Sequence, residues 1–174
     1  MRVARTFAFV DLCGFTRFTD THGDEEAVDV LTRFRAAVRE IGSNHGVRVA
    51  KWLGDGAMFV STTEEPLVES ILDLANRCDE LGVTLPLRGG LAGGPVILFE
   101  GDDYIGGPVN LAARLCDAAG PRELLATAEL GRAVPAWATP VPVGEIIIKG
   151  FVLRIDAVRI EHVSVPLPVA GGGR

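Results

Sequence analysis

The first part of the chain contains a continuous apolar run, followed by a segment in which apolar residues recur at helical spacing. Residues 5–12 contain the uninterrupted run Phe-Ala-Phe-Val, which predicts a buried strand rather than an alternating, half-exposed one. In residues 24–44 apolar side chains recur at helical spacing, so a helix is predicted there, with Asp20 or Thr21 as its cap.

A β-hairpin is the next predicted element. Residues 47–53 and 57–61 are both strand-like, and Gly54-Asp55-Gly56 lies between them. Glycine supplies the positive φ angles that a tight hairpin turn needs. A second amphipathic helix is predicted over residues 67–81, ending near Gly82.

The second half of the chain is predicted to form shorter strands and helices. Residues 87–98 hold strand-like segments that are broken by glycines. A third helix is predicted over residues 108–118, because Pro108 suits the first helical turn. Two further strand regions are predicted over residues 123–126 and 141–160. A short helix is predicted between them, over residues 127–133.

Together these elements predict an α+β fold. The hairpin implies mixed strand directions, so we expect a mixed or antiparallel sheet with helices packed on it and covering one face. The order of elements favours a ferredoxin-like (palm-like) βαββαβ core. One domain is expected over residues 1–162, followed by a disordered tail over residues 163–174.

Composition narrows the class of protein. The chain has 174 residues, 48% of them hydrophobic, which suffices for one well-buried domain. Its net charge of −6 argues against a nucleic-acid partner. The three cysteines have unrelated spacings typical of free thiols in a reducing compartment, and no apolar run approaches the roughly 18 residues that a membrane span needs. We therefore expect a cytoplasmic protein that binds neither nucleic acid nor a membrane.

Two aspartates stand at the ends of apolar strands. Asp11 follows the first strand's apolar run, and Asp55 lies in the predicted hairpin turn. A carboxylate at such a place is costly to bury unless it is paired or binds a metal. Paired carboxylates are typical ligands of a hard divalent cation beside a phosphate. The alternative is that Asp55 is an ordinary turn residue.

Polar groups near these aspartates are candidates for binding a ligand. By strand alternation Lys51 shares a face with apolar residues, so it is either a lysine extending from a strand end or a donor to a ligand. The turn over residues 12–16, with Gly14, Phe15 and Thr16, offers backbone N–H groups for phosphate oxygens. Alternatively, Gly14 is simply a turn residue and Phe15 a core aromatic.

A second polar cluster lies in the region of the third helix. Asn110 and Arg114 are four residues apart and so share a helix face, either as a solvated stripe or as ligand-binding groups. Arg114 would suit a developing negative charge on phosphorus, because its guanidinium is always charged. Lys149 ends another apolar run, as an ordinary strand-end lysine would.

Taken in order, these segments resemble the catalytic domain of the class III nucleotidyl cyclases. Five motifs over residues 5–160 carry the resemblance. They are Phe9-Val-Asp-Leu-Cys-Gly-Phe-Thr16, Lys51-Trp-Leu-Gly-Asp-Gly56, Asp103 seven residues before Asn110, Val109-Asn-Leu-Ala-Ala-Arg114 and Lys149-Gly150.

The resemblance implies a metal site and a phosphate site. Asp11 and Asp55, with the backbone carbonyl of Leu12, match the residues that hold two divalent cations, Mg²⁺ or Mn²⁺. One ion would promote attack of the ribose 3′-hydroxyl on the α-phosphorus, and the other would hold the triphosphate. Residues 14–16 belong to the first matched motif, and their backbone N–H groups are expected to contact the phosphates.

The remaining matched residues are implied to bind the nucleotide. Lys51 and Asp103 match the pair that reads the base. A lysine donor suits N1 of adenine, and a carboxylate acceptor suits its N6 amine, whereas guanine presents the opposite pattern. Asn110 matches the residue that positions the ribose, Arg114 the one that stabilises the transition state, and Lys149 a lysine that binds the terminal phosphates.

The implied function is an adenylate cyclase of bacterial type. It would convert ATP to cyclic AMP and pyrophosphate as a homodimer with two composite sites, because in this family the metal residues and the base-reading residues come from different subunits. The alternatives are a guanylate cyclase and an inactive nucleotide- or partner-binding domain. Many members also carry a phosphate-binding arginine before the base-reading aspartate, and residues 96–101 contain none.

Overall fold

The computed structural model describes residues 1–148 and 154–162 of the chain. Lys149 and the expected tail over residues 163–174 lie outside the described residues. None of the helices within the described ranges has both the length and the apolar character needed to cross a bilayer.

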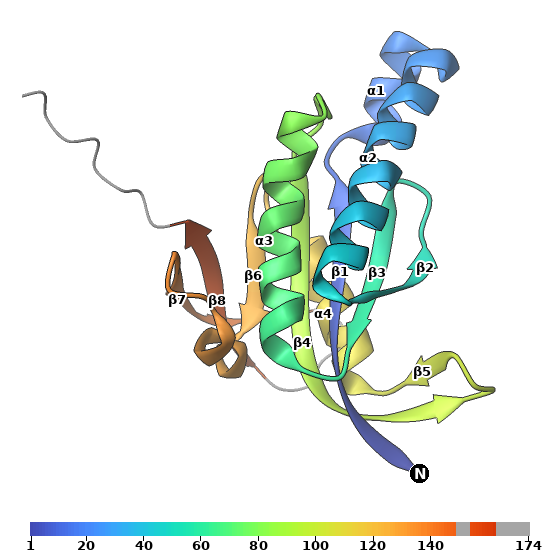
Figure 1. The fold of residues 1–174 in the computed structure, drawn as a ribbon. Coiled ribbons are helices and arrows are strands. Elements are labelled where there is room, and N and C mark those ends of the chain that lie inside the picture. Colours follow the sequence, from blue (N-terminus) through green and yellow to red (C-terminus); the bar gives the residue numbers. More distant parts are fainter. Residues whose placement is uncertain (149–153, 163–174) are drawn as a thin grey trace, which may run out of the picture.

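A single sheet forms the framework of the described chain (Figure 1). Its strand order is β2-β3-β1-β4-β6-β8-β7, and β5 pairs with β4 outside this path. Among the described strands only β4 and β6 run parallel to each other, and the other neighbouring pairs are antiparallel. The strands are β1 (Arg2–Leu12), β2 (Arg48–Trp52), β3 (Gly56–Ser61), β4 (Leu87–Phe99), β5 (Asp103–Ile105), β6 (Leu124–Thr127), β7 (Ala138–Ile146) and β8 (Ile155–His162).

The predicted βαββαβ core is confirmed. It consists of β1, the helices α1 and α2, the hairpin β2–β3, helix α3 and β4, and its strands lie in the order β2-β3-β1-β4. This is the ferredoxin-like arrangement. The helices are α1 (Phe15–His22), α2 (Asp24–His45), α3 (Glu64–Glu80) and α4 (Gly107–Ala118), with a 3₁₀ helix at Ala128–Ala133.

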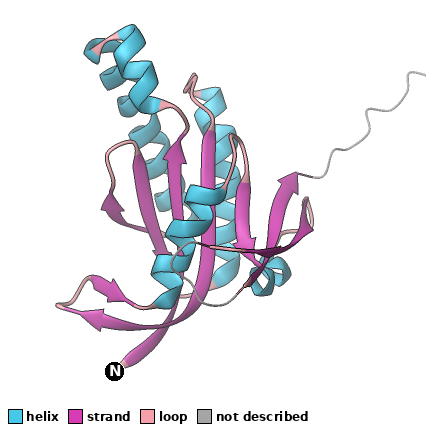
Figure 2. Ribbon diagram, turned by 180° about the vertical axis from the view of Figure 1, so that it is seen from behind, coloured by secondary structure: helices cyan, strands magenta, loops and turns pink. Residues whose placement is uncertain are grey.

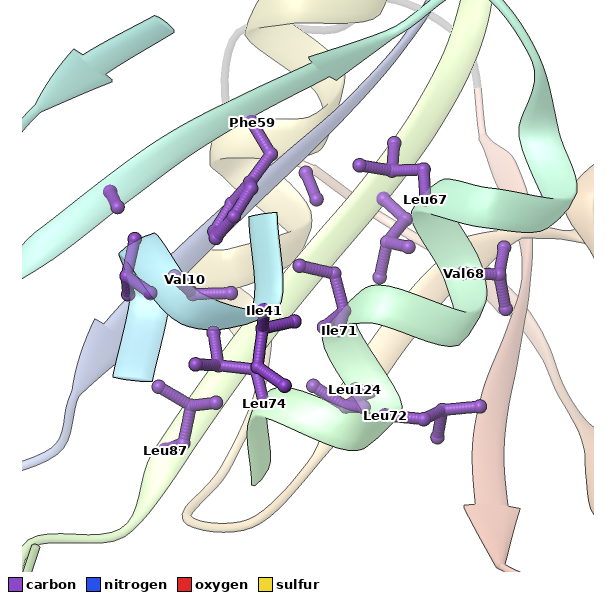
Figure 3. Packing of buried hydrophobic residues seen from close by; sticks show 14 of the residues in the cluster. Val10, Ile41, Phe59, Leu67, Val68, Ile71, Leu72, Leu74, Leu87 and Leu124 are labelled. Atoms are coloured by element: carbon purple, nitrogen blue, oxygen red, sulfur yellow. The ribbon is translucent and has the colours of Figure 1, made fainter. Parts of the chain in front are cut away.

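Helices cover both faces of the sheet, which corrects the prediction of one covered face. Helices α2 and α3 pack on one face, where Ile41, Phe59 and Ile71 meet (Figure 3). Helix α4 packs on the other face (Figure 2). There Ala112 contacts the cluster around Phe7 of β1. The second covered face accounts for the uninterrupted apolar run in β1, since side chains on both of its faces are buried.

Strand β4 is continuous, although its glycines predicted a broken segment. These glycines serve close packing instead. A Cβ atom at Gly90 would lie 2.2 Å from the carbonyl oxygen of Ala112 and from the backbone nitrogen of Cys116 in α4. The absent side chain therefore lets the backbone of α4 lie directly on β4.

The segment between β1 and α2 also differs from the prediction. It contains the additional short helix α1, and α2 begins after Gly23 rather than at a cap by Asp20 or Thr21. The Thr21 hydroxyl donates to the carbonyl of Arg17 within α1 instead. Helix α1 begins at Phe15, so only two residues separate its N-terminus from the end of β1 at Leu12.

Candidate functional site

Asp11 and Asp55 lie together at one end of the sheet. Asp11 is near the end of β1 and pairs in register with Gly56, the residue after Asp55. The backbone N–H of Leu12 donates to the carbonyl of Asp55 at 3.2 Å, which fixes the hairpin turn against β1. Burial, and after it the charge of Asp11, raise the pKa of Asp55. The two carboxylates therefore form a close, mutually repelling pair.

This pair fits a hard divalent cation that is shared with a phosphate ligand. Two carboxylates offer only oxygen ligands, which Mg²⁺ and Mn²⁺ prefer. The third predicted ligand, the backbone carbonyl of Leu12, belongs to the residue that follows Asp11. Within residues 1–148 and 154–162, no group of three or more His, Cys, Asp or Glu side chains is placed to hold a metal. A magnesium site of few carboxylates normally completes its shell with waters and substrate phosphates.

Arg88 is a component of this site that the sequence reasoning missed. It is the second residue of β4 and lies directly opposite Asp11 in the β1–β4 register. Its Nη2 and Nε atoms donate to Oδ2 of Asp11 at 2.8 and 3.1 Å. The only signal for this role in the sequence was an arginine beside apolar strand residues. The β1–β4 register was needed to show that Asp11 is its partner.

Helix α1 begins next to the carboxylate pair. Gly14 precedes it with a positive φ of 77°, and no side chain caps the helix. The first backbone N–H groups of a helix have no partner within it, so those of Phe15 and Thr16 are available to an anion. The side chain of Phe15 packs against the core between the sheet and helices α2 and α3, as the alternative interpretation held.

Lys51 and Asp103 form a second pair. Lys51 Nζ donates to Oδ1 of Asp103 at 2.6 Å, and the backbone N–H of Tyr104 donates to the same oxygen at 3.1 Å. The hydrogen bond from Lys51, and after it the one from Tyr104, lower the pKa of Asp103, so its carboxylate stays an ionised acceptor. The resemblance had already paired these two residues, and the structure adds that Lys51 of β2 and Asp103 of β5 are in contact.

The face on which Lys51 lies differs from the one that strand alternation predicted. The register between β2 and β3 shifts between Val49 and Lys51, so Val49 pairs with Phe59 while Lys51 pairs with Met58. Phe59 belongs to the core under α2 and α3, and Met58 to the opposite one. This β-bulge therefore turns Lys51 away from the apolar face of Val49.

Asn110 and Arg114 lie on the exposed side of α4. Both are solvent-accessible, and the Nη1 atom of Arg114 is 3.6 Å from Oδ2 of Asp117. In the described part of the chain, no hydrogen bond or ion pair joins either residue to Asp11, Asp55 or the Lys51–Asp103 pair. A single chain thus presents the candidate residues as three separate groups. Lys149, the remaining candidate, lies outside the described residues.

The comparisons with known proteins agree with this geometry. No protein-family model matches the chain. An uncharacterised protein of Mycobacterium tuberculosis is 38% identical over 168 residues, which cover 93% of this chain and 44% of that protein. The pH-sensitive adenylate cyclase of the same species is 32% identical over 120 residues, which cover 69% of this chain and 30% of that protein. The chain thus spans less than half the length of these curated relatives.

A solved structure resembles the chain over nearly its whole length. The crystal structure of the adenylyl cyclase CyaB from P. aeruginosa has a TM-score of 0.83 to this chain, at 26% sequence identity. The match covers 96% of this chain and 98% of that one. The structural similarity therefore extends over most of the fold rather than over one motif.

Proposed function

The chain is a class III nucleotidyl cyclase catalytic domain, and from this premise we propose that it converts ATP to 3′,5′-cyclic AMP and pyrophosphate. The observation that carries the choice of ATP is the contact between Lys51 and Asp103, which sets a charged donor beside an ionised acceptor. Adenine offers an acceptor at N1 and a donor at N6, so the pair can bind both atoms.

Guanine would meet the same pair with the wrong pattern. Its O6 is an acceptor and its N1–H a donor, so each base atom would face a protein group of its own kind if Lys51 and Asp103 kept the same places. A site whose polar groups are left unpaired discriminates strongly against such a base. A guanylate cyclase remains the second candidate within the family, and this pair argues against it.

The reaction needs a charge-stabilised triphosphate and an activated ribose hydroxyl. Asp11, Asp55 and the carbonyl of Leu12 would hold two Mg²⁺ or Mn²⁺ ions, which when bound supply the activation of the 3′-hydroxyl and neutralise phosphate charge. The backbone N–H groups of Phe15 and Thr16 would donate to phosphate oxygens. Lys149, which lies outside the described residues, is proposed to contact the terminal phosphates.

Two residues of α4 are proposed to act on the reacting part of the nucleotide. Asn110 would hold the ribose so that its 3′-oxygen is aligned with the α-phosphorus. Arg114 would donate to the oxygens of that phosphorus, where negative charge develops as the new bond forms. Its only charged neighbour within ion-pair distance among the described residues is Asp117, in an exposed contact that is readily exchanged for a ligand.

The separation of these groups supports a symmetric homodimer. In one chain, Asn110 and Arg114 are exposed, and among the described residues no hydrogen bond or ion pair joins them to the carboxylate pair. A second chain would therefore have to supply them to each metal site. The β4–β5 arm offers a surface for that association, because apolar side chains are exposed along it and it extends away from the rest of the sheet (Figure 1). They are Ile97, Leu98, Phe99 and Ile105.

Cyclic AMP formation by the purified chain tests the proposal. Asp11→Ala and Asp55→Ala should each lower turnover by roughly a hundredfold or more, because each removes a metal ligand. Both variants should keep the oligomeric state of the wild type in sedimentation experiments. Retained activity in either variant would refute the metal assignment. A folded dimer that is inactive without any substitution would favour the inactive-domain alternative.

A further inference from the structure

Arg88 is the only basic side chain within ion-pair distance of the proposed metal carboxylates among the described residues. Two of its donor atoms bind the same oxygen of Asp11, Oδ2. Its third donor, Nη1, binds the backbone carbonyl of Asp117 at the end of α4, at 3.2 Å. The guanidinium is therefore fixed from two sides, and its orientation does not depend on Asp11 alone.

This ion pair differs from those on the surface of the molecule. The side chains of Arg88 and Asp11 are each 26% exposed, whereas the arginine side chain of the pair Arg132–Glu64 is 71% exposed. Surface pairs contribute little because water screens them, but a partly buried pair is screened less. The charge of Arg88 therefore acts at close range on whatever the carboxylates bind.

The geometry also divides the two oxygens of Asp11 between two tasks. Oδ2 accepts both hydrogen bonds from Arg88. Oδ1 faces Gly56, where an added Cβ atom would lie 3.4 Å from it, next to the turn that carries Asp55. One oxygen is thus held by the arginine while the other stays open towards the second carboxylate.

We propose that Arg88 is an internal counter-ion of the metal site, a positioning residue that keeps cation binding weak until nucleotide phosphates are present. This inference rests on the metal role of Asp11 and Asp55 in the proposed function. Two carboxylates and one guanidinium leave a single net negative charge, which attracts a divalent cation weakly. The phosphates of a bound nucleotide add the missing negative charge, so metal and substrate bind together.

The expected size of the effect follows from Coulomb's law. A unit charge a few ångströms away, at an effective dielectric constant of about 20, changes the affinity for a divalent cation by at least roughly tenfold. Removing the charge of Arg88 should therefore tighten Mn²⁺ binding in the absence of nucleotide. A purely structural role for Arg88 predicts the reverse, because loss of orientation at Asp11 would weaken metal binding.

Mn²⁺ titration followed by electron paramagnetic resonance tests this inference without turnover. Arg88→Gln removes the charge but keeps an amide that can donate to Asp11, so the fold is preserved better than by an apolar residue. Arg88→Lys keeps the charge. Arg132→Gln is the matched control, because Arg132 also binds a carboxylate through two donors but lies away from the site. Melting curves establish that each variant is folded.

The predicted result is that Arg88→Gln binds Mn²⁺ at least roughly tenfold more tightly than the wild type without nucleotide, while Arg88→Lys and Arg132→Gln do not. With 3′-deoxy-ATP, which cannot cyclise, the difference should shrink. Unchanged or weaker binding by Arg88→Gln would overturn the counter-ion role.

A further variant separates failure of this inference from failure of the proposed function. Asp11→Asn should lose Mn²⁺ binding in the presence of 3′-deoxy-ATP if Asp11 is a metal ligand. If it does so while Arg88→Gln shows no tightening, only the counter-ion role is wrong. If Asp11→Asn binds Mn²⁺ as the wild type does, the metal assignment itself fails, and the inference with it.

Discussion

Mixing two inactive variants of the chain separates the two halves of each proposed site. Asp11→Ala removes a metal ligand, and Arg114→Ala removes the arginine proposed for the transition state. Each variant alone should be at least roughly a hundredfold less active than the wild type. In a heterodimer, however, one site combines the intact metal half of the Arg114→Ala chain with the intact α4 of the Asp11→Ala chain.

The magnitude of the recovery follows from the arrangement of the residues. Arg114 is exposed on α4, and among the described residues no hydrogen bond or ion pair joins it to the Asp11–Asp55 pair of its own chain. Under the proposed arrangement, each metal site would therefore need a partner's arginine. Equal amounts of the two variants, pairing at random, give heterodimers in about half of the dimers, each with one intact site of two. Activity should therefore return to about a quarter of that of the wild type.

A second mixture provides the matched control. Asp11→Ala and Asp55→Ala damage the same half of the site, so their heterodimer has no intact site and should stay inactive. Subunit exchange is verified with differently labelled chains, and cyclic AMP is measured over a range of mixing ratios. No recovery in the first mixture, with exchange verified, would refute composite sites. Equal recovery in both mixtures would refute the assignment of the residues to different halves.

Three further outcomes are expected. Gly90→Ala should lower the melting temperature in calorimetry by roughly 4–10 °C, because a Cβ atom there would meet the α4 backbone at 2.2 Å; Gly120→Ala, with its nearest atom at 3.6 Å, should change it little. Lys51→Glu combined with Asp103→Cys should shift the preference in kcat/KM from ATP towards GTP, and an unchanged preference would contradict the base-reading role. Burial and the neighbouring carboxylate raise the pKa of Asp55, so its ionised form destabilises the fold above that pKa. Asp55→Asn should therefore raise the melting temperature of the metal-free protein near neutral pH and lose this advantage at acidic pH, whereas a pH-independent difference would contradict the reasoning.

Much of the fold followed from local pattern. The helix predicted over residues 24–44 is present as α2, and the hairpin around Gly54-Asp55-Gly56 is present with a φ of 69° at Gly54. Long periodic segments are predictable because one apolar stripe must be buried, whatever the tertiary arrangement. The apolar run before Asp11 indicated a buried strand for the same reason.

The features that could not be predicted from the sequence depend on contacts between segments that are distant in the chain. The bulge that turns Lys51 to the other face arises from the pairing of β2 with β3, and alternation within one strand gives no sign of it. The contact between Arg88 and Asp11 requires the β1–β4 register. The glycines of β4 wrongly predicted a broken strand. Their packing role at Gly90 depends on contact with α4, which comes later in the chain, and the local pattern of β4 does not reveal that contact.

The central claim is that this domain forms cyclic AMP from ATP, and product analysis tests it most directly. The purified chain is incubated with ATP or GTP, each with Mg²⁺ or Mn²⁺, and cyclic AMP and cyclic GMP are quantified. We predict cyclic AMP from ATP with at least one of the two ions and little cyclic GMP from GTP. Cyclic GMP as the main product, or no product from a folded dimer under all four conditions, would contradict the claim.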